Sequence, residues 1–178
     1  MRVVLTALLV LPMAAASAQV LTVCEALDQL SELNGKEVEI RGAWQAGDTG
    51  EWLWAPEPCS HPIVRDGWVW KNTISVKRED ANDYRRWRTI SAQWSALKHG
   101  SPGPNLVLAT LKGRLKTRDH FKVSRFSHLP EAYGYSPAVL VVSKAEHLQA
   151  VPCSNEQLAR AEKEAVSPWP VRIKKAHP

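Results

Sequence analysis

The side chains of this sequence whose type and spacing could bind a ligand are above all its eight tryptophans. Four of them form two Trp-x-Trp pairs, Trp52 with Trp54 and Trp68 with Trp70. Residues at alternate positions of a strand share one face, and indole rings on an open face can stack on unpaired bases. Each pair is therefore either a binding platform or a part of the hydrophobic core.

The neighbouring residues separate the two pairs. Trp68 and Trp70 share the apolar face of a strand predicted at residues 68–77, which favours a position in the core. The other pair, Trp52 and Trp54, belongs to a short strand that is apolar on both faces, so either face can be inside. This pair is the better candidate for stacking on a ligand.

A long loop predicted at residues 119–137 would close over a ligand on that pair. Loops longer than ~12–15 residues are usually functional or disordered, and the aromatic content of this loop argues against disorder. Its candidate ligand-binding residues are His128, Tyr133 and Tyr135, and His61 joins the same set. The expected partner is an oligosaccharide, a single-stranded nucleic acid or another exported protein.

The cysteines and histidines do not form a recognisable metal-binding motif. A site made of Cys24, Cys59 and His61 is conceivable, but the sequence has no C-x-x-C or H-x-x-x-H pair. Spacing does not determine which of the three cysteines pair, and an odd number leaves one thiol over. We expect no metal and no cofactor.

Motifs of the common enzyme classes are also absent. The sequence has no G-x-S-x-G, phosphate-binding loop, H-E-x-x-H or dinucleotide fingerprint, so we expect no catalytic residues and a non-catalytic protein. Glu51, His61, Asp66 and His128 could converge in space, which keeps an alternative open. That alternative is an exported hydrolase, such as a nuclease that acts on an anionic polymer.

The N-terminus has the pattern of a secretory signal peptide. Arg2 precedes an apolar run over residues 3–16, and Ala16-Ser17-Ala18 is an A-x-A cleavage site. The run is shorter than the ~20 residues that span a membrane. The sequence LTVC at residues 21–24 lies too far beyond the run for a lipoprotein signal. We expect cleavage after Ala18 and a periplasmic or extracellular protein.

Hydrophobic periodicity predicts the elements that position these residues. Helices are predicted at residues 22–34, 79–98 and after Ser154, and strands at residues 36–44, 51–55, 68–77, 105–118 and 138–143. Three strands, a helix and two strands is the order of the OB-fold, a five-stranded Greek-key barrel. The predicted fold is therefore mainly β: an OB-like barrel at residues 19–150 follows the signal peptide at 1–18, and a helix with an exposed basic tail occupies 151–178.

Two features of the strands refine this prediction. Gly42 lies on the apolar face of the first barrel strand, where a glycine often marks a bulge or a bend at a barrel corner. Lys112, Arg114, Lys116 and Arg118 form a basic row on the fourth strand. The net charge of +5 is modest, so we interpret the row as a solvated face rather than a nucleic-acid site.

Five stretches of the chain also resemble a protein family. They are VCEAL at 23–27, NGKEVEIRG at 34–42, CSHPIVRDGWVW at 59–70, LKGRLKTR at 111–118 and SPAVLVV at 136–142. Together, over residues 22–145, they resemble small exported bacterial proteins of unknown function with an OB-like fold. The resemblance implies that Cys24 and Cys59 are the paired cysteines and that Cys153 lies outside the shared region. It implies no activity.

The expected function follows from these observations together. We expect an exported binding module without catalytic activity that holds its ligand or partner protein across the second and third strands of the barrel, a face that OB barrels commonly use.

Overall fold

The computed structural model describes residues 19–47, 50–65, 68–78, 84–100, 102–117, 136–166 and 171–172. The predicted signal peptide therefore lies outside the described residues. The same holds for His128, Tyr133 and Tyr135 of the predicted long loop and for Asp66 and Arg118.

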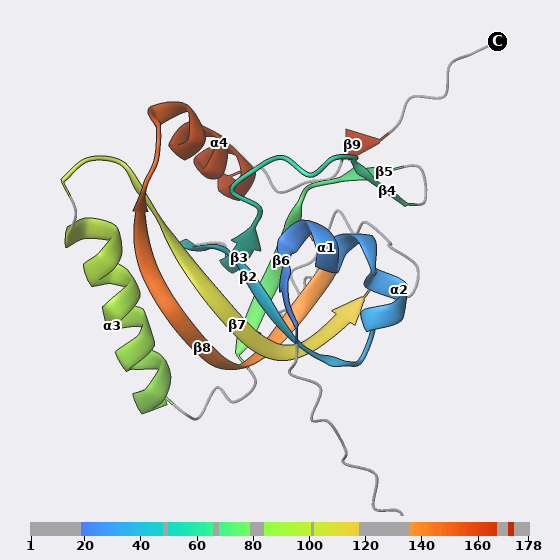
Figure 1. Cartoon of the computed structure of the whole chain (residues 1–178), viewed down its shortest axis with the longest axis horizontal. Coiled ribbons are helices and arrows are strands. Elements are labelled where there is room, and N and C mark those ends of the chain that lie inside the picture. Colours follow the sequence, from blue (N-terminus) through green and yellow to red (C-terminus); the bar gives the residue numbers. More distant parts are fainter. Residues whose placement is uncertain are drawn as a thin grey trace, which may run out of the picture.

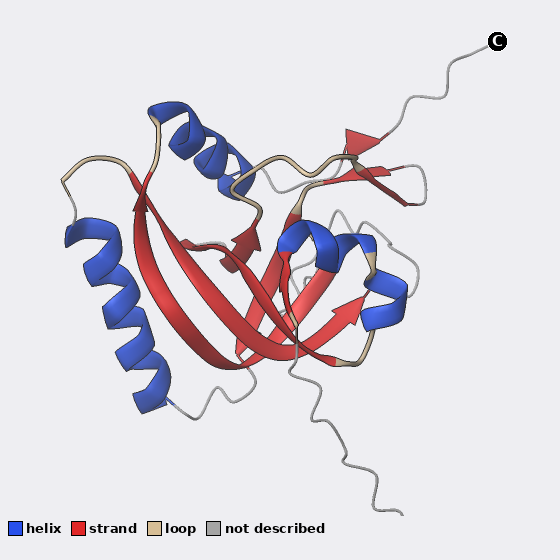
Figure 2. Ribbon diagram, viewed as in Figure 1, coloured by secondary structure: helices blue, strands red, loops and turns tan. Residues whose placement is uncertain are grey.

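Strands dominate the described residues (Figure 2). The strands are β1 (Val20–Thr22), β2 (Glu37–Gly47), β3 (Gly50–Trp54), β4 (Ile63–Arg65), β5 (Trp68–Trp70), β6 (Thr73–Arg78), β7 (Asn105–Thr117), β8 (Ala138–Pro152) and β9 (Val171–Arg172). The helices are α1 (Val23–Asp28), α2 (Leu30–Leu33), α3 (Tyr84–Gly100) and α4 (Asn155–Val166).

Five of the strands form a closed barrel in the order β2, β3, β6, β8 and β7, and β7 pairs with β2 to close it. The pairing of β6 with β8 is parallel, and the other pairings within the barrel are antiparallel. Helix α3 connects β6 to β7 and runs beside β8, while α4 follows β8 (Figure 1). The predicted fold class, an OB-like barrel with additional helices, is confirmed.

Strand β2 changes its partner at the predicted corner. Residues 37–43 pair with β7, whereas residues 43–47 pair with β3. A Cβ atom on Gly42 would lie 2.6 Å from Cγ2 of Val23, so only glycine lets α1 pack this closely on the strand. The change of partner beside Gly42 agrees with the predicted barrel corner.

The hydrophobic core fills the barrel. Its fully buried aliphatic side chains include Ile40, Leu53, Ile74, Leu111, Leu115 and Leu140. Helix α3 adds Trp87 and Ile90 from its apolar stripe. Trp94 of the same stripe donates a hydrogen bond from Nε1 to the carbonyl of Trp44, at 3.0 Å, which fixes the helix against β2.

The predicted third strand is wrong as a single element. Residues 68–77 divide at Lys71 and Asn72 into β5 and β6, and β5 leaves the barrel to pair with β4 and β9 in a separate small sheet. Thr73 and Ile74, adjacent in sequence, are both buried, so the alternation does not run through the break. Trp70 is nevertheless in the core as predicted, with 2% of its surface exposed.

The C-terminal third also differs from the prediction. Strand β8 extends to Pro152 instead of ending at Ser143, because its second half continues to pair with the first half of the long strand β7. The predicted domain boundary at 150 thus falls inside a strand. Val171 and Arg172 pair with β5 rather than belonging to a free tail.

Candidate functional site

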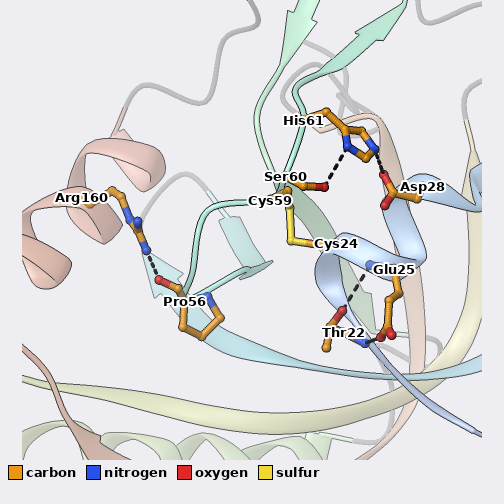
Figure 3. The surroundings of a disulfide bond; sticks show 9 residues. All are labelled: Thr22, Cys24, Glu25, Asp28, Pro56, Cys59, Ser60, His61 and Arg160. Atoms are coloured by element: carbon orange, nitrogen blue, oxygen red, sulfur yellow. Dashed lines mark hydrogen bonds and ion pairs between the residues drawn. A yellow bond between two sulfur atoms is a disulfide. The ribbon is translucent and has the colours of Figure 1, made fainter.

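A disulfide joins α1 to the segment that follows β3. The sulfur atoms of Cys24 and Cys59 are 2.08 Å apart, and the two Cα atoms are 5.4 Å apart. The pairing that the family resemblance implies is confirmed, and Cys153 is a free, half-buried thiol. The bond fixes one end of the proline-rich segment at residues 55–59 beside the first turn of α1 (Figure 3).

The first turn of α1 is itself fixed by a capping box. The backbone N–H of Glu25 donates to the hydroxyl of Thr22 at 3.2 Å, and the carboxylate of Glu25 accepts from the N–H of Thr22 at 2.7 Å. This bond to the backbone of Thr22 lowers the pKa of Glu25. The cap holds the junction between β1 and α1 in one conformation.

Helix α4 holds the proline-rich segment from the other side. The guanidinium of Arg160 donates to the carbonyl of Pro56 (Figure 3). The side chain of Gln157 donates to the carboxylate of Glu57 over a longer distance of 3.5 Å. The start of α4 is capped by reciprocal bonds between Ser154 and Gln157. Segment 55–59 is therefore held between two helices that lie far apart in the sequence.

A cavity of about 290 Å³ opens between this segment, the start of α1 and strand β2. Its walls are mostly apolar and are formed by Thr22, Val23, Cys24, Arg41, Gly42, Ala55, Pro56, Glu57, Pro58 and Leu108. Binding sites for small molecules typically measure ~300–1,000 Å³ and have apolar walls with a few polar groups. This cavity is at the small end of that range and suits one apolar group or a short chain.

The charged side chains near the cavity differ in whether they form ion pairs. On the outer face of β2, Glu37 and Glu39 approach the ammonium of Lys112 on β7, at 3.7 and 3.3 Å, and the contact with Glu39 contributes most to raising the pKa of Lys112. Arg41 is the next residue of that face and reaches the cavity wall. It is exposed, and it forms no ion pair with any other described residue. Glu57 is the acidic group of the wall.

The predicted basic row is thus partly neutralised. Lys112 is paired with two carboxylates, while Arg114 and Lys116 are exposed on the outer face of β7. This arrangement agrees with a solvated face that carries alternating charges.

The tryptophan pair that we expected to stack on a ligand is buried. Only 4% of the surface of Trp52 and of Trp54 is exposed. Trp54 packs in a second core cluster with Ala161 of α4, and the guanidinium of Arg160 lies 5.6 Å from its ring centre. A ring covered in this way has no face open to a sugar or a base, which argues against a stacking platform. The loop residues predicted to close over the pair lie outside the described residues.

The remaining predicted ligand-binding residue, His61, belongs to a polar array at the surface. Its Nδ1 is 2.8 Å from the hydroxyl of Ser60, and its Nε2 is 3.1 Å from Oδ1 of Asp28 (Figure 3). These are the residue types of a serine-hydrolase triad, in which a buried aspartate orients the histidine. Here the side chains of His61 and Asp28 are 64% and 39% exposed, and none of the three residues lines the cavity.

Sequence reasoning missed most of the cavity. Arg41, Gly42 and Leu108 come together only through the register of β2 with β7, which no local pattern specifies. The prolines at 56 and 58 were a visible signal of an irregular, rigid segment, but not of what lies beneath it. The contact of Asp28 with His61 likewise depends on the fold.

Among the residues that the structure describes, no group of three or more His, Cys, Asp or Glu side chains is placed to hold a metal ion. None of the described helices has the length and apolar character needed to cross a membrane.

None of the family models compared with this chain matches it, and neither a curated protein nor a solved structure does. The resemblance to small exported bacterial proteins therefore stays an expectation based on the motifs.

Proposed function

We propose that this protein is an exported, non-catalytic binding module and that the cavity between β2, α1 and segment 55–59 is its binding site. The observation that carries the proposal is the apolar cavity of about 290 Å³ with walls held in place by the disulfide. A preformed site avoids the cost of ordering its own side chains on binding. The site differs from the barrel face that we expected from OB-like proteins.

The chemistry of the walls supports binding rather than catalysis. The hydroxyl of Thr22 is already engaged by the backbone N–H of Glu25, and Cys24 is oxidised in the disulfide. Neither is free to act as a nucleophile. A hexyl chain buried in the cavity would gain at most about 4–5 kcal/mol, at ~0.8 kcal/mol per methylene, which corresponds to millimolar affinity.

Nuclear magnetic resonance with 1-hexanol as the probe tests the proposal. We expect shifts of the backbone amide signals at residues 22–24, 41–42, 55 and 57 in the wild-type protein; Pro56 and Pro58 have no N–H. Leu108→Trp should abolish them because the larger side chain fills the cavity. Val64→Trp is the matched control, since Val64 is 47% exposed and does not line the cavity. Shifts that persist in Leu108→Trp, or that occur elsewhere, would contradict the proposal.

Hydrolysis is a second candidate function, favoured by the array of Ser60, His61 and Asp28. In acyl transfer the hydroxyl of Ser60 would attack a carbonyl while His61 accepts its proton. Turnover of p-nitrophenyl acetate by the wild-type protein and by Ser60→Ala separates the two candidates. A hydrolase loses its turnover with this substitution, whereas a binding module shows the same background rate in both proteins.

A further inference from the structure

We infer that the ligand of the cavity is an apolar chain that ends in a carboxylate and that Arg41 binds this head group. The inference rests on the proposed function of the cavity as a binding site. It adds the chemical class of the ligand and the residue that distinguishes a charged chain from a neutral one of the same length.

The position of Arg41 in the row of charged side chains on β2 suits it to bind an anion. The two acidic residues before it on the same face, Glu37 and Glu39, both lie within ion-pair distance of Lys112. Arg41 continues the row to the cavity and has no carboxylate partner among the described residues. An exposed cation beside an apolar cavity is complementary to an amphipathic anion, because the chain and the head group each find their own surroundings.

The backbone that carries Arg41 is held rigidly. Its strand position is paired on both sides, with Thr22 of β1 and with Thr110 of β7. A guanidinium can donate two parallel hydrogen bonds to one carboxylate, and a fixed backbone reduces the entropy lost when it does so. Residues on strands position such a group more precisely than residues on loops.

Glu57 is the group that opposes this inference. Its carboxylate also lines the cavity and would repel an anion or attract an amine. However, it accepts a hydrogen bond from Gln157, which draws it towards α4. A comparison of head groups of opposite charge decides which of the two residues the ligand contacts.

The test measures the affinities of hexanoate, 1-hexanol and hexylamine, which share one apolar chain, by calorimetric titration. The wild-type protein should bind hexanoate at least about tenfold more tightly than 1-hexanol, the lower end for a charge-assisted hydrogen bond. Hexylamine should bind most weakly. Higher salt should weaken the binding of hexanoate and leave 1-hexanol unchanged.

Two substitutions locate the effect. Arg41→Met keeps an apolar stem and should reduce the affinity for hexanoate to that for 1-hexanol. Arg114→Met, which removes an exposed arginine from the same outer face away from the cavity, should change neither affinity. If Arg41→Met fails to fold, Arg41→Lys should fold and bind hexanoate with intermediate affinity, because a point charge replaces the bidentate group.

The outcomes separate this inference from the proposed function. If none of the three probes binds, the proposed function and the inference both fail. Equal binding of hexanoate and 1-hexanol, with no effect of Arg41→Met, overturns the inference and leaves the binding site intact. Tightest binding of hexylamine also overturns it and identifies Glu57 as the head-group residue.

Discussion

Trp54 and Trp70 are equally well buried, but different parts of the protein cover them. Trp70 belongs to the main core, whereas Trp54 lies under α4 in the second cluster. We therefore expect both Trp54→Ala and Trp70→Ala to lower the free energy of unfolding by ~3–5 kcal/mol, as for other buried aromatic residues. Urea denaturation measures this, with Arg85→Ala, an exposed residue of α3, as the control. A Trp54→Ala protein of wild-type stability would restore the stacking hypothesis.

The disulfide gives a prediction about single residues. It closes a loop with a sequence separation of 35 residues, so removing it in Cys24→Ser/Cys59→Ser should cost about 3–4 kcal/mol in the chain-entropy model. Thermal or urea unfolding with and without a reducing agent measures the loss. Reductant should destabilise the wild-type protein and Cys153→Ser but not the double variant. Equal stability of all three proteins in the absence of reductant would contradict the structural role of this bond.

For single residues, the sequence predicted some structural roles but not the contacts that join distant parts of the chain. The core position of Trp70 followed from the apolar residues of its strand, and the pairing of Cys24 with Cys59 from the family resemblance. The contact between Asp28 and His61 could not be predicted, because it joins a helix to a loop through the folded chain. The burial of Trp54 was equally inaccessible, since its cover comes from Ala161, more than a hundred positions away.

Gly113 of β7 tests how tightly the strands of the barrel pack against each other. A Cβ atom on Gly113 would lie 2.2 Å from the carbonyl oxygen of Val141, where the register of β7 with β8 shifts. Gly113→Ala should therefore destabilise the barrel by at least ~1–3 kcal/mol through overpacking. Gly100→Ala is the matched control, because nothing lies within 4 Å of its added methyl group. It should be neutral or stabilise by about 0.4–1 kcal/mol. Chemical denaturation of both variants measures their stability, and a larger loss in Gly100→Ala than in Gly113→Ala would contradict the prediction.

The capping box of α1 predicts a pH dependence. The folded protein lowers the pKa of Glu25 below its ordinary value of 4.5 through the bond to the backbone of Thr22. Its contribution to stability is therefore complete above the unfolded pKa and is lost as the pH falls through the folded pKa. Between about pH 6 and pH 3, the wild-type protein should lose more stability than Glu25→Gln does.

The control for this comparison is Glu32→Gln, an exposed carboxylate of α2, which should follow the wild-type profile. Thr22→Ala should lower stability by about 1 kcal/mol at neutral pH, as loss of an N-cap does. It should also flatten the acid profile in part, because the hydroxyl of Thr22 is the second cause of the lowered pKa of Glu25, while the larger cause, the bond to the backbone N–H of residue 22, remains. Unfolding midpoints measured over this pH range test both statements, and parallel profiles for all variants would contradict them.

Elements set by local pattern were predictable, and elements set by distant pairing were not. The strand predicted at 105–118 is apolar in its first half and alternates in its second half, and it matches β7 within one residue. The division of residues 68–77 was not predicted, because its two halves belong to two different sheets. The second half of β8 reads as polar surface and forms a strand only because β7 lies beside it.

For the whole molecule, the order of the elements was enough to predict the barrel. Three strands, a helix and two strands allow few closed arrangements, and closure by pairing of β2 with β7 is the one observed. The order of the elements did not predict the small sheet of β4, β5 and β9, in which Val171 and Arg172 pair with Val69 and Trp68. The order of the elements did not predict the cavity either, because β1, segment 55–59 and β7 contribute to its walls from separate parts of the chain.

The last prediction concerns the predicted export of the protein and the oxidation of its cysteines. The A-x-A pattern predicts cleavage after Ala18, and the disulfide of Cys24 requires an oxidising compartment to persist. Protein purified from the periplasm or medium of a bacterium that expresses the full chain should begin at Gln19. Its intact mass should show one disulfide and one free thiol, that of Cys153.

The same measurement tests the alternative of a lipoprotein. A lipid on Cys24 would occupy the sulfur that bonds to Cys59, so the two modifications exclude each other. A mature chain that begins at Cys24 with an added lipid would also lack β1, whose residues Val20–Thr22 pair with β2 and form part of the cavity. Deleting residues 2–18 provides the control. The cytoplasmic protein should then carry three thiols and unfold as easily as Cys24→Ser/Cys59→Ser. An intact Met1 on the full chain, or an oxidised protein from the deletion, would contradict the coupling of export to disulfide formation.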